Sequence, residues 1–194
     1  MSAGKAYQVD VTDEAAVKKA VNEQVREFDG RLDIFVANSG IPWTQGAATA
    51  GEVSHYHKVV STDLDGVFFC GRAAAEVWRR QAIEGTDLDG RKLENYTLGS
   101  FIATASMSGH IVNVPQLQAA YNAAKAGVIH LCKHWTLSLS ILEEICMLMI
   151  DRNSSPLSRR RVDTIRALQH RLTGLYCHGN IRLCASRNKR SMEK

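Results

Sequence analysis

A tyrosine and a lysine stand four residues apart in the segment Tyr121-Asn122-Ala123-Ala124-Lys125. Residues at this spacing are neighbours on one face of an α-helix. An ammonium group beside a phenol favours the phenolate, which makes a tyrosine a usable proton donor or acceptor near neutral pH. A serine hydroxyl at a nearby strand end, as at Ser106, could hold the oxygen of a substrate carbonyl. This set suits the reduction of a carbonyl or the oxidation of an alcohol; the alternative is an ordinary surface pair on an ordinary helix.

The residues before this pair predict the elements that position it. Gly99 to Ala105 form a short β-branched and aromatic run, which is typical of a buried strand. The run breaks at Ser106-Met107-Ser108-Gly109, passes through a loop with Pro115, and continues as a helix of small residues from about Ala119. We therefore expect a strand, a serine-containing turn and a helix that carries the tyrosine and the lysine.

The first forty residues predict two more strands joined by a helix. Lys5 to Val11 and Asp33 to Ala37 are the expected strands. Thr12 or Asp13 can cap the helix between them, and Gly30 ends it. The apolar face of this helix recurs at helical spacing: Val17, Val21, Val25 and Phe28. Two strands joined by one helix make a parallel βαβ unit.

Ligands of parallel sheets bind at the carboxyl ends of the strands, where Asp10, Asn38 and Ser106 would all lie. Between the second and third expected strands, Gly46 to Ala82 is predicted to be mostly helical. Glu84 to Leu98 is polar and contains glycine, so we expect a surface loop there.

Composition and charge limit the function classes. Apolar residues make up 45% of the 194 residues, yet no apolar run approaches the roughly 20 residues of a membrane span, and no signal-peptide pattern opens the chain. Five cysteines without regular spacing favour reduced thiols and a cytoplasmic location, with Cys70 and Cys132 packed in the core. We expect no membrane partner.

The chain divides into two unlike parts. Residues 1–134 carry 13 Lys and Arg against 15 Asp and Glu, a net charge of −2. Residues 135–194 carry 11 against 5, a net charge of +6, and nine of the eleven are arginine. We predict a partial α/β domain over 1–134 and an atypical basic tail over 135–194 that is partly helical or disordered. The apolar segment after Trp135 could prolong the preceding helix.

The tail offers two further sites, and neither is favoured. His and Cys side chains gather near its end, but their spacing matches no regular zinc pattern, so we expect no metal: His170, Cys177, His178 and Cys184. Arg159-Arg160-Arg161 lacks interleaved aromatic residues, which favours a solvated tail over a nucleic-acid site.

Four segments together resemble the short-chain dehydrogenase/reductase family, and within it the fungal mannitol dehydrogenases and sorbose-type reductases. They are Ala37-Asn38-Ser39-Gly40, Asp63-Leu64-Asp65-Gly66-Val67-Phe68, Ser106-Met107-Ser108-Gly109-His110 and the Tyr121 to Lys125 segment. The resemblance covers roughly residues 5–134. It implies a nicotinamide-dependent oxidoreductase that acts on a sugar alcohol or ketose. The cofactor would be NADP, with NAD as the alternative, and family members are usually homo-oligomers.

The resemblance also implies roles for single residues. Asp10 would contact the adenine ring, and the turn at Asn38 would line the cofactor. Tyr121 would be the acid/base. Lys125 would hold the nicotinamide ribose hydroxyls and favour the phenolate. Asp63 aligns with a family asparagine that anchors a proton-relay water, and an aspartate can still bind a water; the alternative is a polar residue at a helix bend.

Two serines compete for the catalytic hydroxyl. The family's S-x-x-G spacing selects Ser106, three residues before Gly109, whereas the commoner interval to Tyr121 selects Ser108. We favour Ser106, because the strand end and the glycine fix the local geometry while the following loop can vary in length.

The family's first strand and glycine-rich turn, which holds the cofactor pyrophosphate, have no counterpart in the sequence. Nor does the tail match the strand that follows the catalytic helix in the family. The predicted fold is therefore a Rossmann-type, doubly wound parallel sheet that lacks the first βαβ unit and the C-terminal strand. The alternative function is a catalytically inactive fragment that binds no cofactor and serves at most as an interaction module.

Overall fold

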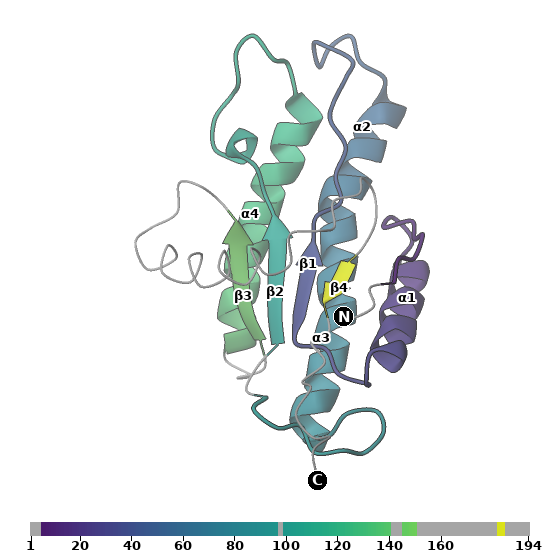
Figure 1. Cartoon of the computed structure of the whole chain (residues 1–194). Helices are drawn as coiled ribbons and strands as arrows, with labels where there is room; N and C mark the ends of the chain where they lie inside the picture. The colour runs from purple at the N-terminus through teal and green to yellow at the C-terminus, as the bar shows by residue number, and fades with distance from the viewer. Residues whose placement is uncertain (1–4, 97–98, 141–144, 151–181, 185–194) are drawn as a thin grey trace.

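The computed structural model describes residues 5–96, 99–140, 145–150 and 182–184 (Figure 1). Its helices are α1 (Glu14–Glu27), α2 (Val53–Val60), α3 (Gly66–Glu84) and α4 (Ala119–Ser140). A π-helical turn, η1 (Ser61–Asp65), joins α2 to α3, and a 3-10 turn, η2 (Met107–Gly109), precedes α4. The strands are β1 (Ile34–Ala37), β2 (Gly99–Thr104), β3 (Ile145–Ile150) and β4 (Arg182–Cys184). Within these ranges, no helix has the length and hydropathy to cross a membrane.

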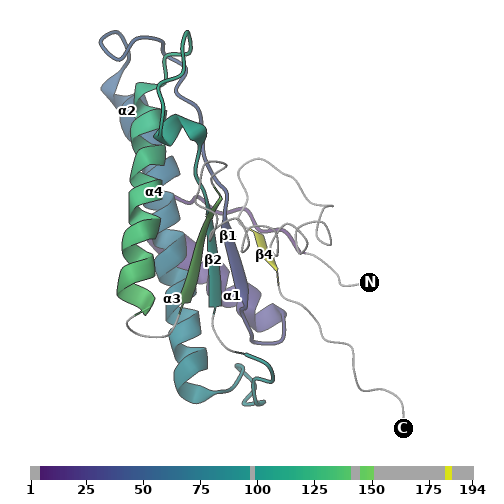
Figure 2. The same cartoon turned by 90° about the vertical axis from the view of Figure 1, so that its left-hand side faces the viewer.

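The strands form one sheet in the order β3-β2-β1-β4. β1 and β3 both run parallel to β2, with Phe35 opposite Phe101 and Phe101 opposite Met147, whereas β4 is antiparallel to β1. The helices α3 and α4 lie along one face of the sheet, as the edge-on view shows (Figure 2). The predicted parallel α/β sheet is confirmed, and its crossover from β1 to β2 runs through α2, η1 and α3.

The prediction of a strand over Lys5 to Val11 is wrong. The segment is irregular in the structure, and none of the described strands pairs with it. An extended segment becomes a strand only through hydrogen bonds to a neighbour, so alternating apolar residues are not sufficient. The helix that follows is confirmed: Asp13 caps α1 and its carboxylate accepts a hydrogen bond from Ala16 N at 3.0 Å.

A second correction concerns the residues after the Tyr121 helix. Ile145–Ile150 form β3, so the expectation that no strand follows the Tyr121 helix is wrong. The apolar segment prolongs α4 as far as Ser140 and then supplies this strand. The predicted boundary at residue 134 falls inside α4 and stays a prediction. The tail predictions for 151–181 and 185–194, including the arginine run and most of the His/Cys group, fall outside the described residues.

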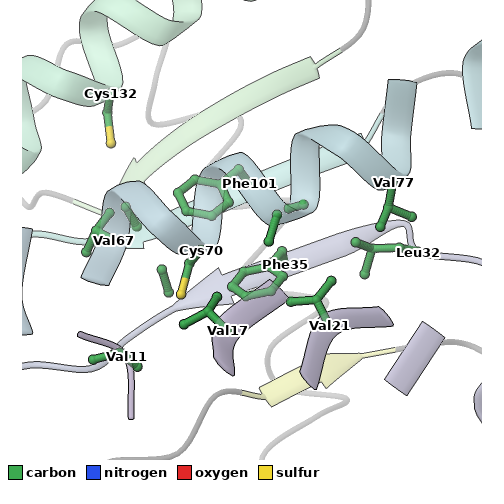
Figure 3. Close-up of a cluster of buried hydrophobic side chains, with 14 of the residues drawn as sticks. Val11, Val17, Val21, Leu32, Phe35, Val67, Cys70, Val77, Phe101 and Cys132 are labelled. Carbon is green, nitrogen blue, oxygen red and sulfur yellow. The ribbon is translucent and has the colours of Figure 1, made fainter. Parts of the chain in front are cut away.

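The core lies between the sheet and its covering helices (Figure 3). Val17 and Val21 of α1 point toward the sheet, where Phe35 stacks on Phe101 with ring centroids 5.7 Å apart. Cys70 is also buried in this core, and burial raises the pKa of its thiol to about 12. Cys132 is buried as well, with its thiol pKa likewise raised to about 12 by burial. The prediction that these two cysteines pack in the core is confirmed.

Two side chains of α3 fix the start of β1. Gln81 is fully buried, and its amide accepts a hydrogen bond from Leu32 N at 2.7 Å and donates one to Leu32 O at 2.9 Å. Trp78 Nε1 donates to the same carbonyl at 3.0 Å. A buried backbone group needs a partner, and here a glutamine supplies what a neighbouring strand would otherwise supply. These bonds hold the residues just before β1 against α3, and so fix where β1 lies along this helix.

Candidate active site

A pocket of about 390 Å³ opens where β1 and β2 end. The loops that follow these two strands extend beyond the sheet at this end, beside α2 and the start of α4 (Figure 1). Gly40 and Pro42 line it together with eight residues that have polar side chains: Asn38, Thr104, Ser106, Ser108, Gln116, Gln118, Tyr121 and Lys125. The predicted set of serine, tyrosine and lysine therefore lies in one pocket, at the end of the sheet where parallel α/β proteins bind ligands.

Lys125 is the buried charge of this pocket, with only 3% of its surface exposed. Its Nζ donates a hydrogen bond to the carbonyl oxygen of Thr104 at 3.1 Å and lies 3.5 Å from Asp63 Oδ2. The ammonium also lies 5.6 Å from the ring centroid of Tyr121. The prediction that Tyr121 and Lys125 are neighbours on one helix face is confirmed. Burial lowers the pKa of Lys125, and the charge of Asp63 opposes this effect.

Asp63 lies in the π-helical turn η1 and is fully buried. Its Oδ1 accepts a hydrogen bond from Ile41 N at 2.7 Å, which ties the loop after β1 to this turn. Burial raises the pKa of its carboxyl, and the charge of Lys125 and the bond from Ile41 N oppose the rise. Single π-helical turns occur frequently at functional sites. The carboxylate contacts the lysine directly and is not among the residues that line the pocket.

The two candidate serines occupy different environments. Ser106 precedes η2, is partly exposed, and its Oγ accepts a hydrogen bond from Ser108 N at 3.2 Å. Ser108 is buried, and its Oγ accepts a hydrogen bond from Asn113 Nδ2 at 2.7 Å. Both line the pocket. Each hydroxyl accepts its bond, so the hydroxyl hydrogen of either serine is left to donate, and Ser106 is the more exposed of the two.

Gly109 lets the serine turn lie directly on α4. A Cβ at this position would stand 2.8 Å from the carbonyl carbon of Lys125 and 2.9 Å from Ala126 N, both backbone atoms of the helix. It would also meet Ile129 Cδ1 at 2.7 Å. The glycine of the Ser106 to Gly109 turn is therefore a packing requirement, because backbone atoms within a helix cannot move aside.

Asn38 and Asp10 were both predicted at strand ends, and of the two only Asn38 lines the pocket. Asn38 lines the pocket, and its Oδ1 accepts a hydrogen bond from Thr104 Oγ1 at 2.7 Å, which bridges the ends of β1 and β2. Asp10 is exposed and does not line the pocket. Its carboxylate accepts hydrogen bonds from the backbone N and hydroxyl of Thr12, and these lower its pKa.

The sequence did not single out several residues of the pocket. Thr104 is the last residue of β2 and supplies both the carbonyl that holds Lys125 and the hydroxyl that holds Asn38. Its place at a strand end was a usable signal. Gln116 and Gln118 come from the loop before α4, for which no local pattern predicted a pocket position. Within the part of the chain that the structure describes, no group of His, Cys, Asp and Glu side chains could hold a metal ion.

Known proteins match this chain over its first two thirds. A family model described as enoyl-(acyl carrier protein) reductase matches residues 1–142. L-xylulose reductase of Hypocrea jecorina is 58% identical over 136 residues, which are 68% of this chain and 47% of that protein. An NADP-dependent mannitol dehydrogenase of Alternaria alternata is 40% identical over 129 residues, 66% of this chain and 42% of that protein. The chain thus spans about half the length of the curated relatives it matches.

A solved structure agrees with these sequence relatives. A short-chain type dehydrogenase/reductase of Mycobacterium marinum superposes with a TM-score of 0.62 at 30% identity. The superposition covers 73% of this chain and 50% of that protein. A family model that covers most of the chain, close sequence relatives and a shared fold lead to one conclusion: this chain belongs to the short-chain dehydrogenase/reductase family.

Proposed function

We propose that this chain forms the catalytic pocket of an oxidoreductase that interconverts a sugar alcohol and a ketose with NADP(H). One observation carries the proposal: Ser106, Tyr121 and Lys125 line a single pocket at the carboxyl ends of β1 and β2. The names of the relatives support the substrate class and the cofactor, since they include an L-xylulose reductase, a sorbose reductase and NADP-dependent mannitol dehydrogenases.

The side chains of the pocket divide the work of carbonyl reduction. Ser106 donates a hydrogen bond to the carbonyl oxygen and holds it beside Tyr121. The phenol of Tyr121 gives its proton to this oxygen as negative charge develops there. The ammonium of Lys125, near the ring, stabilises the phenolate that remains. In alcohol oxidation the same groups act in reverse, with the phenolate of Tyr121 accepting the hydroxyl proton.

The residues present fit the nicotinamide and ribose end of the cofactor. The ammonium of Lys125, the amide of Asn38 and the hydroxyl of Tyr121 all line the pocket. They provide hydrogen-bond donors and acceptors for the ribose hydroxyls. Gly40 lies close to Lys125, since a Cβ at Gly40 would stand 3.2 Å from Nζ. Because a glycine has no side chain, the loop places none over the ammonium at this position. When bound, NADPH supplies the hydride that reduces the carbonyl carbon. Among the residues that line this pocket there is no glycine-rich turn for a pyrophosphate.

The choice of Ser106 over Ser108 rests on their different exposure. The hydroxyl of Ser108 is buried and accepts a hydrogen bond from Asn113 Nδ2, whereas Ser106 is partly exposed. Ser106 receives its bond from a backbone amide, which orients Oγ and leaves the hydroxyl hydrogen to donate.

The proposal is tested in two preparations. The first is the 194-residue chain, titrated with NADPH by fluorescence. The second is a hybrid in which residues 5–134 replace the matching segment of the Hypocrea jecorina L-xylulose reductase. We expect the hybrid to consume NADPH with L-xylulose or sorbose and the chain alone to bind NADPH more weakly than the hybrid. A hybrid that folds and binds NADPH but reduces no ketose would contradict the proposal and favour the alternative of a catalytically inactive fragment.

A further inference from the structure

Asp63 has an unusual environment for a carboxylate. It is 0% exposed, and its Oδ1 is paired with Ile41 N at 2.7 Å. Its Oδ2 has no hydrogen-bond partner among the described residues and lies 3.5 Å from Lys125 Nζ, an ion-pair distance. Burying a charge is unfavourable unless it is paired, so the ammonium is what permits a carboxylate at this position.

Among the residues whose side chains the structure describes, the other elements around Lys125 place no second ion-pair partner beside its ammonium. η2 contributes the uncharged residues Met107–Gly109, and Thr104 of β2 contributes a carbonyl. α2 packs against α4 through Val59, while its His57 and Lys58 are exposed. The second acid of η1, Asp65, is exposed as well. A further titratable group that the structure places beside the ammonium is Tyr121, on the same helix.

We propose that Asp63 is a positioning residue that keeps Lys125 charged at the floor of the pocket through a direct ion pair. The same carboxylate holds the loop after β1 through Ile41 N, so one side chain fixes the catalytic ammonium and the pocket wall together. The resemblance suggested a residue that anchors a water here, a role that a neutral side chain could also fill. In a direct contact between carboxylate and ammonium, by contrast, the negative charge of Asp63 is itself required. The consequence for catalysis rests on the proposed function, whereas the charge relation between the two residues does not.

The close packing of Gly40 agrees with this arrangement. A Cβ at Gly40 would stand 3.0 Å from Asp63 Oδ2 and 3.2 Å from Lys125 Nζ, so the loop backbone lies directly against the ion pair. The loop backbone therefore helps to cover Asp63 from solvent, while Lys125 still lines the pocket. Exclusion of water strengthens the electrostatic interaction between the two groups.

The test measures the pKa of Lys125 by NMR in the full chain, with side-chain 13C and 15N labelling of lysine and assignment through a Lys125→Arg variant. Asp63→Asn keeps an oxygen that can accept from Ile41 N but removes the charge. We expect the pKa of Lys125 to fall by about one to three units in Asp63→Asn. Asp65→Asn is the matched control, because it removes an equal charge from an exposed position two residues away. An equal pKa of Lys125 in wild type and in Asp63→Asn would overturn the proposal.

A reciprocal measurement covers the case in which Asp63→Asn does not fold. In Lys125→Met, the carboxyl 13C signal of Asp63 should titrate at a higher pH than in wild type, because burial then acts without the opposing charge. An unchanged titration of Asp63 would also overturn the proposal. Both readings are made without cofactor or substrate, so a failure of the proposed reductase activity leaves them interpretable.

Discussion

Replacement of Lys125 by methionine should destabilise the fold because it leaves a buried carboxylate without its counter-charge. Lys125 and Asp63 have side-chain exposures of 4% and 0%, and their charged atoms are 3.5 Å apart. At an effective dielectric constant of about 20, two unit charges at that separation attract by about 5 kcal/mol. Desolvation of the two charges offsets much of this attraction in the wild type. When one partner is removed, the desolvation penalty of the other charge is no longer compensated. We therefore expect Lys125→Met to lower the free energy of unfolding by about 3–5 kcal/mol at neutral pH.

A second substitution separates the charge effect from lost packing. In the double variant Lys125→Met/Asp63→Asn no buried charge remains, and the asparagine oxygen can still accept a hydrogen bond from Ile41 N. We expect the double variant to recover about half or more of the lost stability, since a neutral pair in place of a buried ion pair is often tolerated. Lys133→Met, at an exposed position of the same helix, is the matched control and should change stability by less than about 0.5 kcal/mol.

The pH dependence follows from the raised pKa of Asp63. A carboxyl whose pKa is higher in the folded state than in the unfolded state binds its proton more tightly when folded, so stability falls as pH rises through the folded pKa. Loss of Lys125 raises this pKa further, and the deficit of Lys125→Met should therefore be smaller at pH about 5 than at pH about 8. This stability deficit is measured at both pH values by urea unfolding followed by circular dichroism. A Lys125→Met variant within about 1 kcal/mol of wild type at both values would refute the reasoning.

Three further predictions concern the scaffold and the serines. Gln81→Leu leaves Leu32 N buried without an acceptor and should lower the free energy of unfolding by about 1–3 kcal/mol in urea titrations; a neutral result would show that Leu32 finds another partner. Gly109→Ala places a Cβ within 3 Å of the α4 backbone and should lower the melting temperature, with a loss of about 1–3 kcal/mol; an unchanged melting temperature would mean that the turn can shift. In the hybrid enzyme, Ser106→Ala should lower kcat more than Ser108→Ala, and the reverse order would assign the catalytic hydroxyl to Ser108.

The part of the site that local spacing determines could be predicted from the sequence. Tyr121 and Lys125 are four residues apart on a helix of small residues, so their proximity requires only that the helix forms. The β-branched run before Ser106 likewise predicted β2 and the position of the serine turn at its end. The cap of α1 by Asp13 is a third local feature.

The features that depend on a distant partner could not be predicted. Lys5 to Val11 has a strand-like pattern, but a strand also needs a neighbour, and none of the described strands pairs with this segment. The apolar segment with Ile145–Ile150 has no clean periodicity and was expected at most to prolong the helix, whereas pairing with β2 makes these residues a strand. The contact between Asp63 and Lys125 joins residues far apart in the chain, and no spacing rule indicates it.

The most direct measurement of the central claim is the turnover of Tyr121→Phe in the hybrid that carries residues 5–134 of this chain. The substitution removes the proton donor and keeps the ring beside Lys125. We expect kcat for ketose reduction with NADPH to fall by about 10²–10⁴, the usual contribution of a positioned acid/base, while NADPH still binds. Tyr56→Phe, at an exposed tyrosine of α2, is the matched control and should retain full turnover. Full activity of Tyr121→Phe in a hybrid that binds NADPH would contradict the assignment of this pocket as the catalytic one.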